Sequence, residues 1–333
     1  MSIHEGTILV TGGAGLIGSA LVWALNNLGI ESIVVCDRLG RDDRYKHLIP
    51  LRFNDFVDAD DLWSYLETPE AEEIRTIFHL GACADTTETD ARYLMQNNFD
   101  FTKKLAQIAV SRRIRFVYAS SAATYGDGQD GMDDNELCID QLRPLNAYGY
   151  SKQLFDIYAW RRALPIYGMK YFNVFGPNED HKGPMESMVR RGFHQIQATG
   201  SVKLFKSYHP DYLDGRQQRD FLYVKDAVAM TIFLGDVPEF VDGEPTAGIY
   251  NLGSGVAHTW VDLVSPIFSA LNLPPKIEYI DMPESLRAKY QYYTCGNIQK
   301  LRNIGYTTPT TPLAEAVQDY VLNYLVPGKL LGA

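Results

Sequence analysis

The sequence contains few cysteines, and none of them stand close together. Its 333 residues include four, Cys36, Cys83, Cys138 and Cys295, which form no C-x-x-C pair and no cluster with histidine. Zinc sites and disulfide frameworks show recognisable cysteine spacings, and these are missing here. We therefore expect reduced thiols and no metal site.

The chain also lacks an excess of positive charge and any long apolar run. Lys and Arg number 31 against 41 Asp and Glu, giving a net charge of -10, so neither nucleic acid nor an anionic membrane is expected as a partner. No stretch approaches about 18 uninterrupted apolar residues, and the first residues show no basic segment followed by an apolar one. We expect a cytoplasmic protein.

What is present is an ordinary globular composition, with 46% hydrophobic and 22% charged residues. This suits one large core with a smaller second lobe. Apolar runs alternate with amphipathic segments in the first half, which predicts parallel strands joined by right-handed crossovers. The fold class we expect is α/β, a Rossmann-like doubly wound parallel sheet. The expected strands are Thr7–Thr11, Ile33–Cys36, Ile77–Leu80 and Phe116–Ala119, and the expected helices are Ile17–Leu28 and Tyr93–Ala109.

The second half is less regular. A helix over about Ala147–Ala163 and a strand over Met169–Val174 precede a segment rich in Gly, Pro, His and charge, residues 176–218, with one helix near Met185–Thr199. Strands at Asp220–Val224 and Ile249–Leu252 and a helix at Leu313–Tyr324 follow. We predict a dinucleotide-binding domain of residues 1–173 plus about 219–255. About 174–218 plus 256–333 would form a smaller, interwoven α/β substrate lobe.

Three glycines lie between the first expected strand and the first expected helix. Gly12, Gly15 and Gly18 allow a tight turn and a close approach of the backbone to a pyrophosphate, and the helix N-terminus supplies N–H donors. Three glycines alone would indicate only a turn. With a strand before them and a helix after them, they predict a dinucleotide site.

Asp37 stands 19 positions after Gly18, at the end of the next expected strand. A carboxylate there can hold the ribose hydroxyls of NAD. Arg38 follows directly, with Arg41 and Arg44 nearby, and a guanidinium can bind a 2′-phosphate through two hydrogen bonds. We predict NADP as cofactor, with NAD as the alternative. A solvated arginine loop is the plain structural interpretation.

Tyr148 and Lys152 are four residues apart on an expected helix and therefore share one face. A phenol titrates near ~10, and a nearby ammonium and an oxidised nicotinamide would both lower its pKa and make it a base. Ser121 follows an expected strand, where a hydroxyl can orient a substrate hydroxyl. Such residues are common in helices and turns, but together with the glycine loop they indicate dehydrogenase chemistry.

Over nearly its full length the chain resembles the extended short-chain dehydrogenase/reductase superfamily acting on nucleotide sugars. The motifs are Thr11–Gly18, Ser120–Gly126, the Tyr148 and Lys152 pair, and Arg219-Asp220-Phe221. Further motifs are Phe78–Glu88, Pro144–Lys152 and Tyr171–Gly183. These segments are similar to the ADP-glyceromanno-heptose 6-epimerase family within the superfamily, and His181-Lys182-Gly183 is the discriminating element.

This resemblance implies an isomerase that oxidises ADP-D-glycero-D-manno-heptose at C-6, turns the ketone and reduces it from the opposite face. Tyr148 can serve only one face, so a second acid/base is expected, and the resemblance assigns it to Lys182. From the sequence alone, Lys182 would be a surface lysine. A desolvated lysine beside a positive cofactor would have a lowered pKa and could take or deliver a proton.

The resemblance also implies which residues bind the two ligands, and it implies a homo-oligomer, for which a pentamer is one form. Arg219 has a reason of its own, because a diphosphate needs a cation; the alternative is an ion pair with Asp220. The implied cofactor residues are Gly12, Gly15, Leu16, Ile17, Gly18, Asp37, Arg38, Arg44, Leu80, Gly81, Ala82, Cys83, Ala84, Asn97, Lys152, Val174 and Lys182. The implied sugar-nucleotide residues are Ser121, Asn173, Pro184, Arg191, Phe205, Lys206, Ser207, Tyr208, Arg219 and Tyr290.

Some residues depart from the family pattern, and other functions are open. Pro184 and Arg191 stand where a polar residue and a histidine are common, and the loop 209–215 is longer than in some relatives, which puts the exact sugar in doubt. A UDP-hexose 4-epimerase or a 4,6-dehydratase is the nearest alternative, although Ala122 and Ala123 stand where a dehydratase normally has an acidic pair. A non-catalytic dinucleotide-sensing protein is the alternative of another class, and the intact Tyr148 and Lys152 argue against it.

Overall fold

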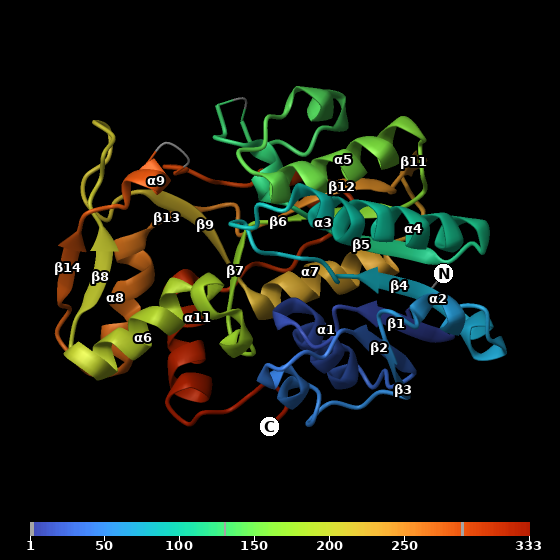
Figure 1. The fold of residues 1–333 in the computed structure, drawn as a ribbon, viewed down its shortest axis with the longest axis horizontal. Coiled ribbons are helices and arrows are strands. Elements are labelled where there is room, and N and C mark those ends of the chain that lie inside the picture. The colour runs from blue at the N-terminus through green and yellow to red at the C-terminus, as the bar shows by residue number, and fades with distance from the viewer. Residues whose placement is uncertain (1–2, 130, 288–289) are drawn as a thin grey trace.

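The larger part of the molecule is a seven-stranded sheet in the order β12-β6-β5-β4-β1-β2-β3 (Figure 1). A computed structural model describes residues 3–129, 131–287 and 290–333. All neighbouring strands of this sheet are parallel, and the order reverses beside β1, as in a doubly wound sheet. The predicted Rossmann-like α/β class is confirmed. The strands are β1 (Thr7–Thr11), β2 (Ile33–Asp37), β3 (Asp55–Asp58), β4 (Ile74–His79), β5 (Arg115–Ser121), β6 (Tyr167–Tyr171) and β12 (Gly248–Leu252).

Helices cover both faces of this sheet. Along β1, Ile8 and Val10 belong to the core on the face of α1 (Leu16–Asn27) and α7 (Val224–Asp236), whereas Leu9 belongs to the core under α4 (Phe101–Ser111) and α5 (Ala147–Arg161). Burial on both faces explains why the strands are continuously apolar rather than alternating. The carboxyl ends of the strands form one edge, where the site described below lies.

The helix expected over Tyr93–Ala109 is present, but its middle turn is wider than an α-helix. It runs as α3 (Ala91–Leu94), a π-helical segment Met95–Asp100, and α4. The π turn contains the buried Asn98, which holds the loop after β4. Its Oδ1 accepts from the Cys83 N–H at 2.9 Å, and its Nδ2 donates to the Cys83 carbonyl at 3.0 Å.

The second lobe contains two small sheets and three longer helices. A three-stranded sheet has the order β13-β9-β7, and β14 pairs with β8 in parallel. The hydrophobic core of the second lobe is continuous with the core around α1 and α7, so the two lobes are interwoven. The elements are β7 (Asn173–Phe175), β8 (Val202–Phe205), β9 (Gln218–Tyr223), β13 (Ala257–Thr259), β14 (Ile277–Ile280), α6 (Met188–Thr199), α8 (Trp260–Ala270) and α11 (Leu313–Tyr320), which continues as η7 (Val321–Leu325).

Short elements connect these layers. Two of the short elements, η1 and η6, matter for the site, because His47 of η1 lies 2.8 Å from the Ala14 carbonyl O in the glycine loop and 2.7 Å from Asp180 in η6. The short connecting elements are η1 (Asp43–His47), α2 (Leu62–Tyr65), η2 (Pro69–Glu73), η4 (Ala122–Tyr125), η5 (Glu136–Gln141), η6 (Asp180–Met185), β10 (Phe240–Val241), β11 (Glu244–Pro245), α9 (Glu284–Arg287) and α10 (Gln299–Asn303). Within the described ranges, every helix is too short or too polar to cross a membrane.

The structure corrects the expected strand Met169–Val174. The chain leaves the large sheet after β6 and enters the three-stranded sheet at β7, with Phe172 between them donating its N–H to the Leu252 carbonyl at 3.0 Å. A sequence that favours a strand on both sides of Phe172 does not show where the chain changes sheets. The helices α7 and α8 were not predicted. β9, at the predicted return to the first domain near residue 219, pairs with β7 and β13, and the domain boundaries stay a prediction.

Candidate active site

The glycine loop joins β1 to α1 at the carboxyl edge of the sheet. Gly12 has a φ of +69°, and a Cβ built on it would lie 2.6 Å from the Gly81 backbone N. A Cβ on Gly18 would lie 2.0 Å from the Gly12 carbonyl O. Both distances are far below contact distance, so glycine is required here. The first turn of α1 contains no acidic side chain, and its N-terminus offers N–H donors to an anion.

Asp37 ends β2, and backbone N–H groups bind both of its carboxylate oxygens. The Oδ2 atom accepts from the Ala14 N–H at 2.8 Å and the Oδ1 atom from the Arg38 N–H at 2.7 Å. Burial raises the Asp37 pKa, although these hydrogen bonds and Arg44 oppose the change. The Arg44 Nη1 atom lies 3.9 Å from Asp37 Oδ1, whereas the Arg38 side chain turns outward and bonds to Asp60 at 2.7 Å.

Tyr148 and Lys152 lie on the first turns of α5, and both are buried. Asn146 caps this helix by accepting a hydrogen bond from the Gly149 N–H at 2.8 Å. The Lys152 Nζ atom donates to the Ala119 carbonyl O at 2.7 Å, which ties the lysine to β5. Burial lowers the pKa of Lys152 to about 8, because an ammonium loses its hydration inside the protein.

Ser121, at the end of β5, lies beside Tyr148. Burial raises the Tyr148 pKa, and a hydrogen bond with Ser121 only partly opposes this change. In the polypeptide the Tyr148 pKa is therefore raised, because phenolate desolvation outweighs the protein groups; its lowering by Lys152 together with an oxidised nicotinamide stays a prediction. Ser120 instead donates to Asp156 at 2.7 Å, which leaves Ser121 as the serine next to the tyrosine.

Lys182 approaches from the other lobe, in η6. It precedes Gly183, which has a φ of +49°. Burial lowers the Lys182 pKa, and Glu179 opposes this. Glu179 is fully buried and accepts from the Ser187 N–H at 2.8 Å and from the Ser187 hydroxyl at 2.5 Å. The sequence alone favoured a solvated lysine; the structure instead contains a largely desolvated one.

Arg219, on β9, is a buried cation bound to carbonyl groups. It donates to the Gln218 carbonyl at 2.8 Å and to the Gln291 carbonyl, and its guanidinium lies 5.1 Å from the centre of the Tyr290 ring. The alternative of an ion pair with Asp220 is wrong. The Asp220 carboxylate is bound elsewhere, by the Ser254 hydroxyl at 2.7 Å and by three backbone N–H groups.

One cavity of about 750 Å³ lies between the two lobes. Tyr148 and Lys182 both line it. So do most of the other predicted residues: Gly12, Gly15, Leu16, Ile17, Gly18, Asp37, Arg44, Leu80, Gly81, Ala82, Ala84, Ser121, Lys152, Asn173, Val174, Pro184, Arg191, Phe205 and Tyr290. Outside its lining lie Arg38, Cys83, Asn97, Lys206, Ser207, Tyr208 and Arg219.

Several of these outlying residues have other hydrogen-bond partners. Asn97 accepts from Arg38 at 2.9 Å. On the loop after β8, the Lys206 ammonium and the Tyr208 hydroxyl both bond to Asp281, at 3.1 and 3.0 Å. Their ligand-binding roles stay predictions, as do those of the residues lining the cavity.

Sequence reasoning missed two buried supports of this site. Asn98 bonds to both Cys83 backbone groups, and also to the Ser151 hydroxyl at 3.0 Å, so it joins the β4 loop to α5. Asp156 pairs with Lys170 at 3.1 Å and raises the Lys152 pKa against the effect of burial. Asp156 stands four residues after Lys152, and this spacing was the one signal in the sequence that could have identified it.

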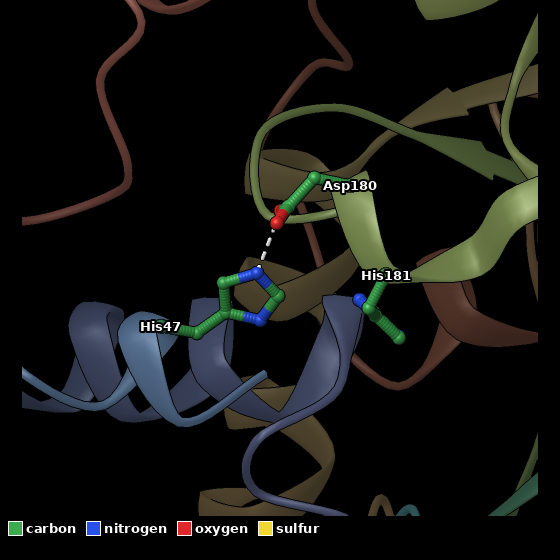
Figure 2. Close-up of side chains that lie close together, drawn as sticks. All are labelled: His47, Asp180 and His181. Atoms are coloured by element: carbon green, nitrogen blue, oxygen red, sulfur yellow. Dashed lines mark hydrogen bonds and ion pairs between the residues drawn. The ribbon is translucent and has the colours of Figure 1, made fainter. Parts of the chain in front are cut away.

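A second cluster lies where η1 meets η6 (Figure 2). The cluster consists of His47, Asp180 and His181, whose possible metal-ligand atoms all lie within 4.8 Å of one another. In the described part of the chain, it is the only group of three or more His, Cys, Asp or Glu side chains close enough to hold a metal ion. Burial and the cations around His181, including Arg44 and Lys182, lower its pKa to about 4. The same positive surroundings disfavour a metal ion, and the expected lack of a metal site stays a prediction.

The sequence of this chain is similar to those of known proteins. Residues 8–253 match the NAD dependent epimerase/dehydratase family. The chain is 46% identical over 322 residues to the ADP-L-glycero-D-manno-heptose-6-epimerase of Nitratidesulfovibrio vulgaris (strain DP4), covering 95% of this chain and 97% of that protein. It is 44% identical over 330 residues to the protein of the same name from Fusobacterium nucleatum, covering 96% and 98%.

Solved structures agree. The ADP-L-glycero-D-manno-heptose-6-epimerase of Helicobacter pylori superposes with a TM-score of 0.76 at 27% identity, over 96% of both chains. The Thermus thermophilus UDP-glucose 4-epimerase, solved with NAD, shares the fold with a TM-score of 0.75 at 23% identity, over 97% of this chain and 100% of that one. The chain therefore belongs to the NAD dependent epimerase/dehydratase family.

Proposed function

We propose that the chain is an ADP-glyceromanno-heptose 6-epimerase, an isomerase that converts ADP-D-glycero-D-manno-heptose to ADP-L-glycero-D-manno-heptose. The observation that carries this proposal is the placement of Tyr148 and Lys182, which line one cavity from the two lobes. Inversion at one carbon needs an acid/base on each face, and this arrangement offers two. The relatives at 46% and 44% identity bear this name, which supports the same substrate.

The residues around the glycine loop fit a dinucleotide. Gly12 and Gly18 leave no room for a Cβ, the α1 N-terminus suits a pyrophosphate, and Asp37 can still accept from ribose hydroxyls. We propose NADP, with Arg38 and Arg44 at its 2′-phosphate and the other predicted cofactor residues around it. When bound, the nicotinamide supplies reversible acceptance of a hydride.

The chain's own groups would manage the proton at the C-6 hydroxyl. Ser121 would orient this hydroxyl, and Tyr148 would exchange its proton on one face. Lys152, held at the Ala119 carbonyl, would stabilise the phenolate through its positive charge. On the other face, Lys182 would exchange the proton, since burial lowers its pKa and favours the neutral amine that can accept one.

The remaining predicted residues would bind the sugar nucleotide. Arg219 is buried, and its positive charge is not paired with Asp220, which leaves it suited to the diphosphate. Asn173, Pro184, Arg191, Phe205 and Tyr290 line the cavity. In the same proposal, residues 1–173 plus about 219–255 bind the dinucleotide, and about 174–218 plus 256–333 bind the substrate. A homo-oligomer stays a prediction.

The test is a substrate panel with cofactor identification. Purified protein is given ADP-D-glycero-D-manno-heptose, UDP-glucose or UDP-galactose, and the cofactor released on denaturation is identified by mass spectrometry. We expect the heptose epimer and the mass of NADP. Preferred turnover of UDP-hexoses would replace the proposal with a 4-epimerase, elimination of water would indicate a dehydratase, and no turnover at all would favour a binding protein.

Solvent deuterium distinguishes direct oxidation at C-6 from a route through an enol or an elimination. If C-6 is oxidised directly, Tyr148 and Lys182 exchange only the hydroxyl proton, and the carbon-bound hydrogen is conserved. Turnover in heavy water should then give product without deuterium at C-6. Deuterium at that carbon would require an enol or an elimination step and would contradict the proposed route.

A further inference from the structure

His47 joins two segments that are far apart in the sequence. It ends η1, and its side chain is fully buried. Its Nδ1 atom lies 2.8 Å from the Ala14 carbonyl O in the glycine loop, and its Nε2 atom lies 2.7 Å from Asp180 Oδ1 at the start of η6 (Figure 2). Asp180 stands two residues before Lys182. One imidazole thus bridges the glycine loop and the turn that holds the lysine.

Both partners of the His47 ring are hydrogen-bond acceptors. A carbonyl oxygen and an ionised carboxylate have no proton to give, so hydrogen bonds to both partners need an N–H on each ring nitrogen. A neutral imidazole has one N–H and an imidazolium has two, so the doubly protonated ring fits both contacts. Burial raises the Asp180 pKa, but the hydrogen bond and charge of His47 outweigh it and the pKa is lowered.

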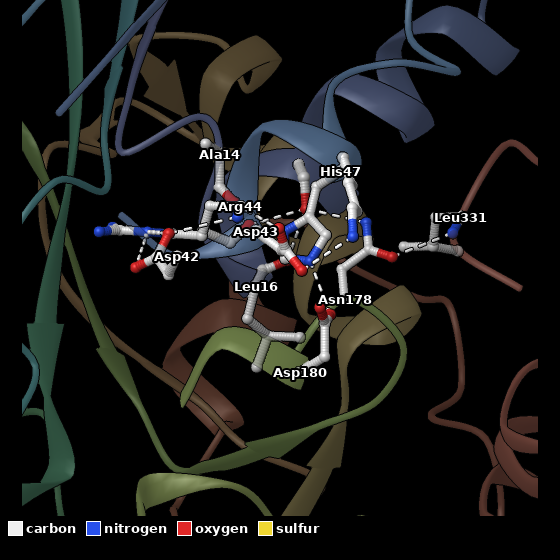
Figure 3. A network of polar contacts seen from close by, with 12 residues as sticks. Ala14, Leu16, Asp42, Asp43, Arg44, His47, Asn178, Asp180 and Leu331 are labelled. Atoms are coloured by element: carbon white, nitrogen blue, oxygen red, sulfur yellow. Dashed lines mark hydrogen bonds and ion pairs between the residues drawn. The ribbon is translucent and has the colours of Figure 1, made fainter. Parts of the chain in front are cut away.

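The chain before Asp180 is also held by α1 and by the C-terminal segment (Figure 3). The buried Asn178 donates to the Ser19 hydroxyl on α1 at 3.0 Å and accepts from the Leu331 N–H at 3.0 Å. After Lys182 comes Gly183, whose φ of +49° only glycine adopts readily. The segment is thus fixed before the lysine by contacts with other segments, and the His47 bridge lies nearer to it than the Asn178 contacts.

We propose that His47 and Asp180 are positioning residues for Lys182. By fixing the turn against the glycine loop, they set the lysine at the distance from the substrate hydroxyl that proton transfer requires. This inference rests on the proposed role of Lys182 as the second acid/base. A displacement of about 1 Å in such a group can lower a rate about a hundredfold, so the bridge acts on catalysis and not only on stability.

The test uses steady-state kinetics of cofactor-loaded enzyme with ADP-D-glycero-D-manno-heptose. Asp180→Asn keeps the size of the side chain but removes its charge, and His47→Gln removes the imidazolium. We expect each to lower kcat about 10- to 100-fold with little change in KM. The double variant should be no slower than the slower single variant, because the two residues act as one unit.

A matched control removes an ion pair elsewhere. The Lys225–Asp319 pair has the same 2.7 Å length, and its carboxylate is 30% exposed against 28% for Asp180; neither partner lines the cavity. Asp319→Asn should lower the Tm without lowering kcat. If Asp180→Asn lowers the Tm or the cofactor content while kcat per loaded enzyme matches the parent, the bridge is only structural and the inference is overturned.

Two further measurements separate this inference from the proposed function. If the parent does not turn over the heptose, or if Lys182→Met stays fully active, the proposed function itself fails. Nitrogen-15 NMR of the parent at neutral pH should show protons on both ring nitrogens of His47. A ring with one bare nitrogen would overturn the bridge, whether or not the variants fold.

Discussion

The two sides of the cavity are built differently. On one side, Tyr148 and Lys152 lie on α5, a capped helix packed on the large sheet, and Lys152 is tied to β5. On the other side, Lys182 lies in the short turn η6, beside a glycine with a positive φ. Regular secondary structure therefore positions the first proposed acid/base, whereas contacts between distant segments position the second.

Burial acts on both sides but favours the neutral form of each group. It raises the pKa of the Tyr148 phenol and lowers that of the Lys182 amine, because the charged form loses hydration in both cases. A neutral phenol can donate a proton, and a neutral amine can accept one. In the proposed function, Tyr148 would therefore act as a proton donor and Lys182 as a proton acceptor across one cavity.

The largest expected effects come from removing either group. Tyr148→Phe and Lys182→Met should each lower kcat by about 10²- to 10⁴-fold, with fold and cofactor content unchanged, because neither residue belongs to the glycine loop. Circular dichroism and cofactor absorbance check the last point. Tyr150→Phe, on the exposed face of the same helix, is the control. Full activity of the Lys182 variant would show that this lysine is not the second acid/base, and the two sides of the cavity would then not share the catalysis.

Arg219 tests the substrate half of the cavity. Arg219→Met should raise KM for the sugar nucleotide about 10- to 150-fold, as expected for loss of one charge-assisted contact worth about 1.5–3 kcal/mol, with a smaller effect on kcat. The exposed Arg216→Met is the matched control. A changed kcat at constant KM would show that Arg219 does not bind the diphosphate.

The arginines after β2 test the cofactor half. Arg38→Met should weaken NADP more than NAD, by about tenfold or more, since one charge-assisted contact to the 2′-phosphate is lost. Arg38 is held by Asp60 and Arg44 lines the cavity, so Arg44→Met shows which of the two carries the preference. Arg41→Met serves as control. Equal losses for both cofactors, measured by titration calorimetry, would contradict the assignment.

The smallest expected effect is on acid stability beneath the Tyr148 side. His79 is buried, between Thr11 and Thr102, and burial lowers its pKa to about 3. Between pH 6.5 and 3, the histidine is protonated in the unfolded chain but stays neutral in the folded protein. The free energy of unfolding therefore falls as the pH falls, by up to about 1.4 kcal/mol per pH unit. His79→Asn should flatten this slope in urea titrations, and an unchanged slope would contradict the prediction.

Much of the first lobe could be predicted from the sequence. The alternation of apolar and amphipathic segments gave β1, α1 and β2 within one or two residues, because that pattern directly reports burial and helix periodicity. The glycine loop could be identified for the same local reason. Tyr148, Lys152 and Ser121 could be grouped because helix spacing and the common edge of parallel strands bring such residues together.

The second lobe and its half of the site depended on the tertiary structure. Only in the folded chain does Asp180 meet His47, 133 positions away. The tertiary structure also decides that the Arg38 side chain points outward and that the Asp220 carboxylate binds groups other than Arg219. It places the strand after Phe172 in another sheet. A sequence pattern reports which positions are buried, but not which distant groups meet there. Desolvation and hydrogen bonding depend on those meetings, so the sequence by itself determined the dinucleotide fold, while the surroundings of Lys182 were decided by tertiary packing.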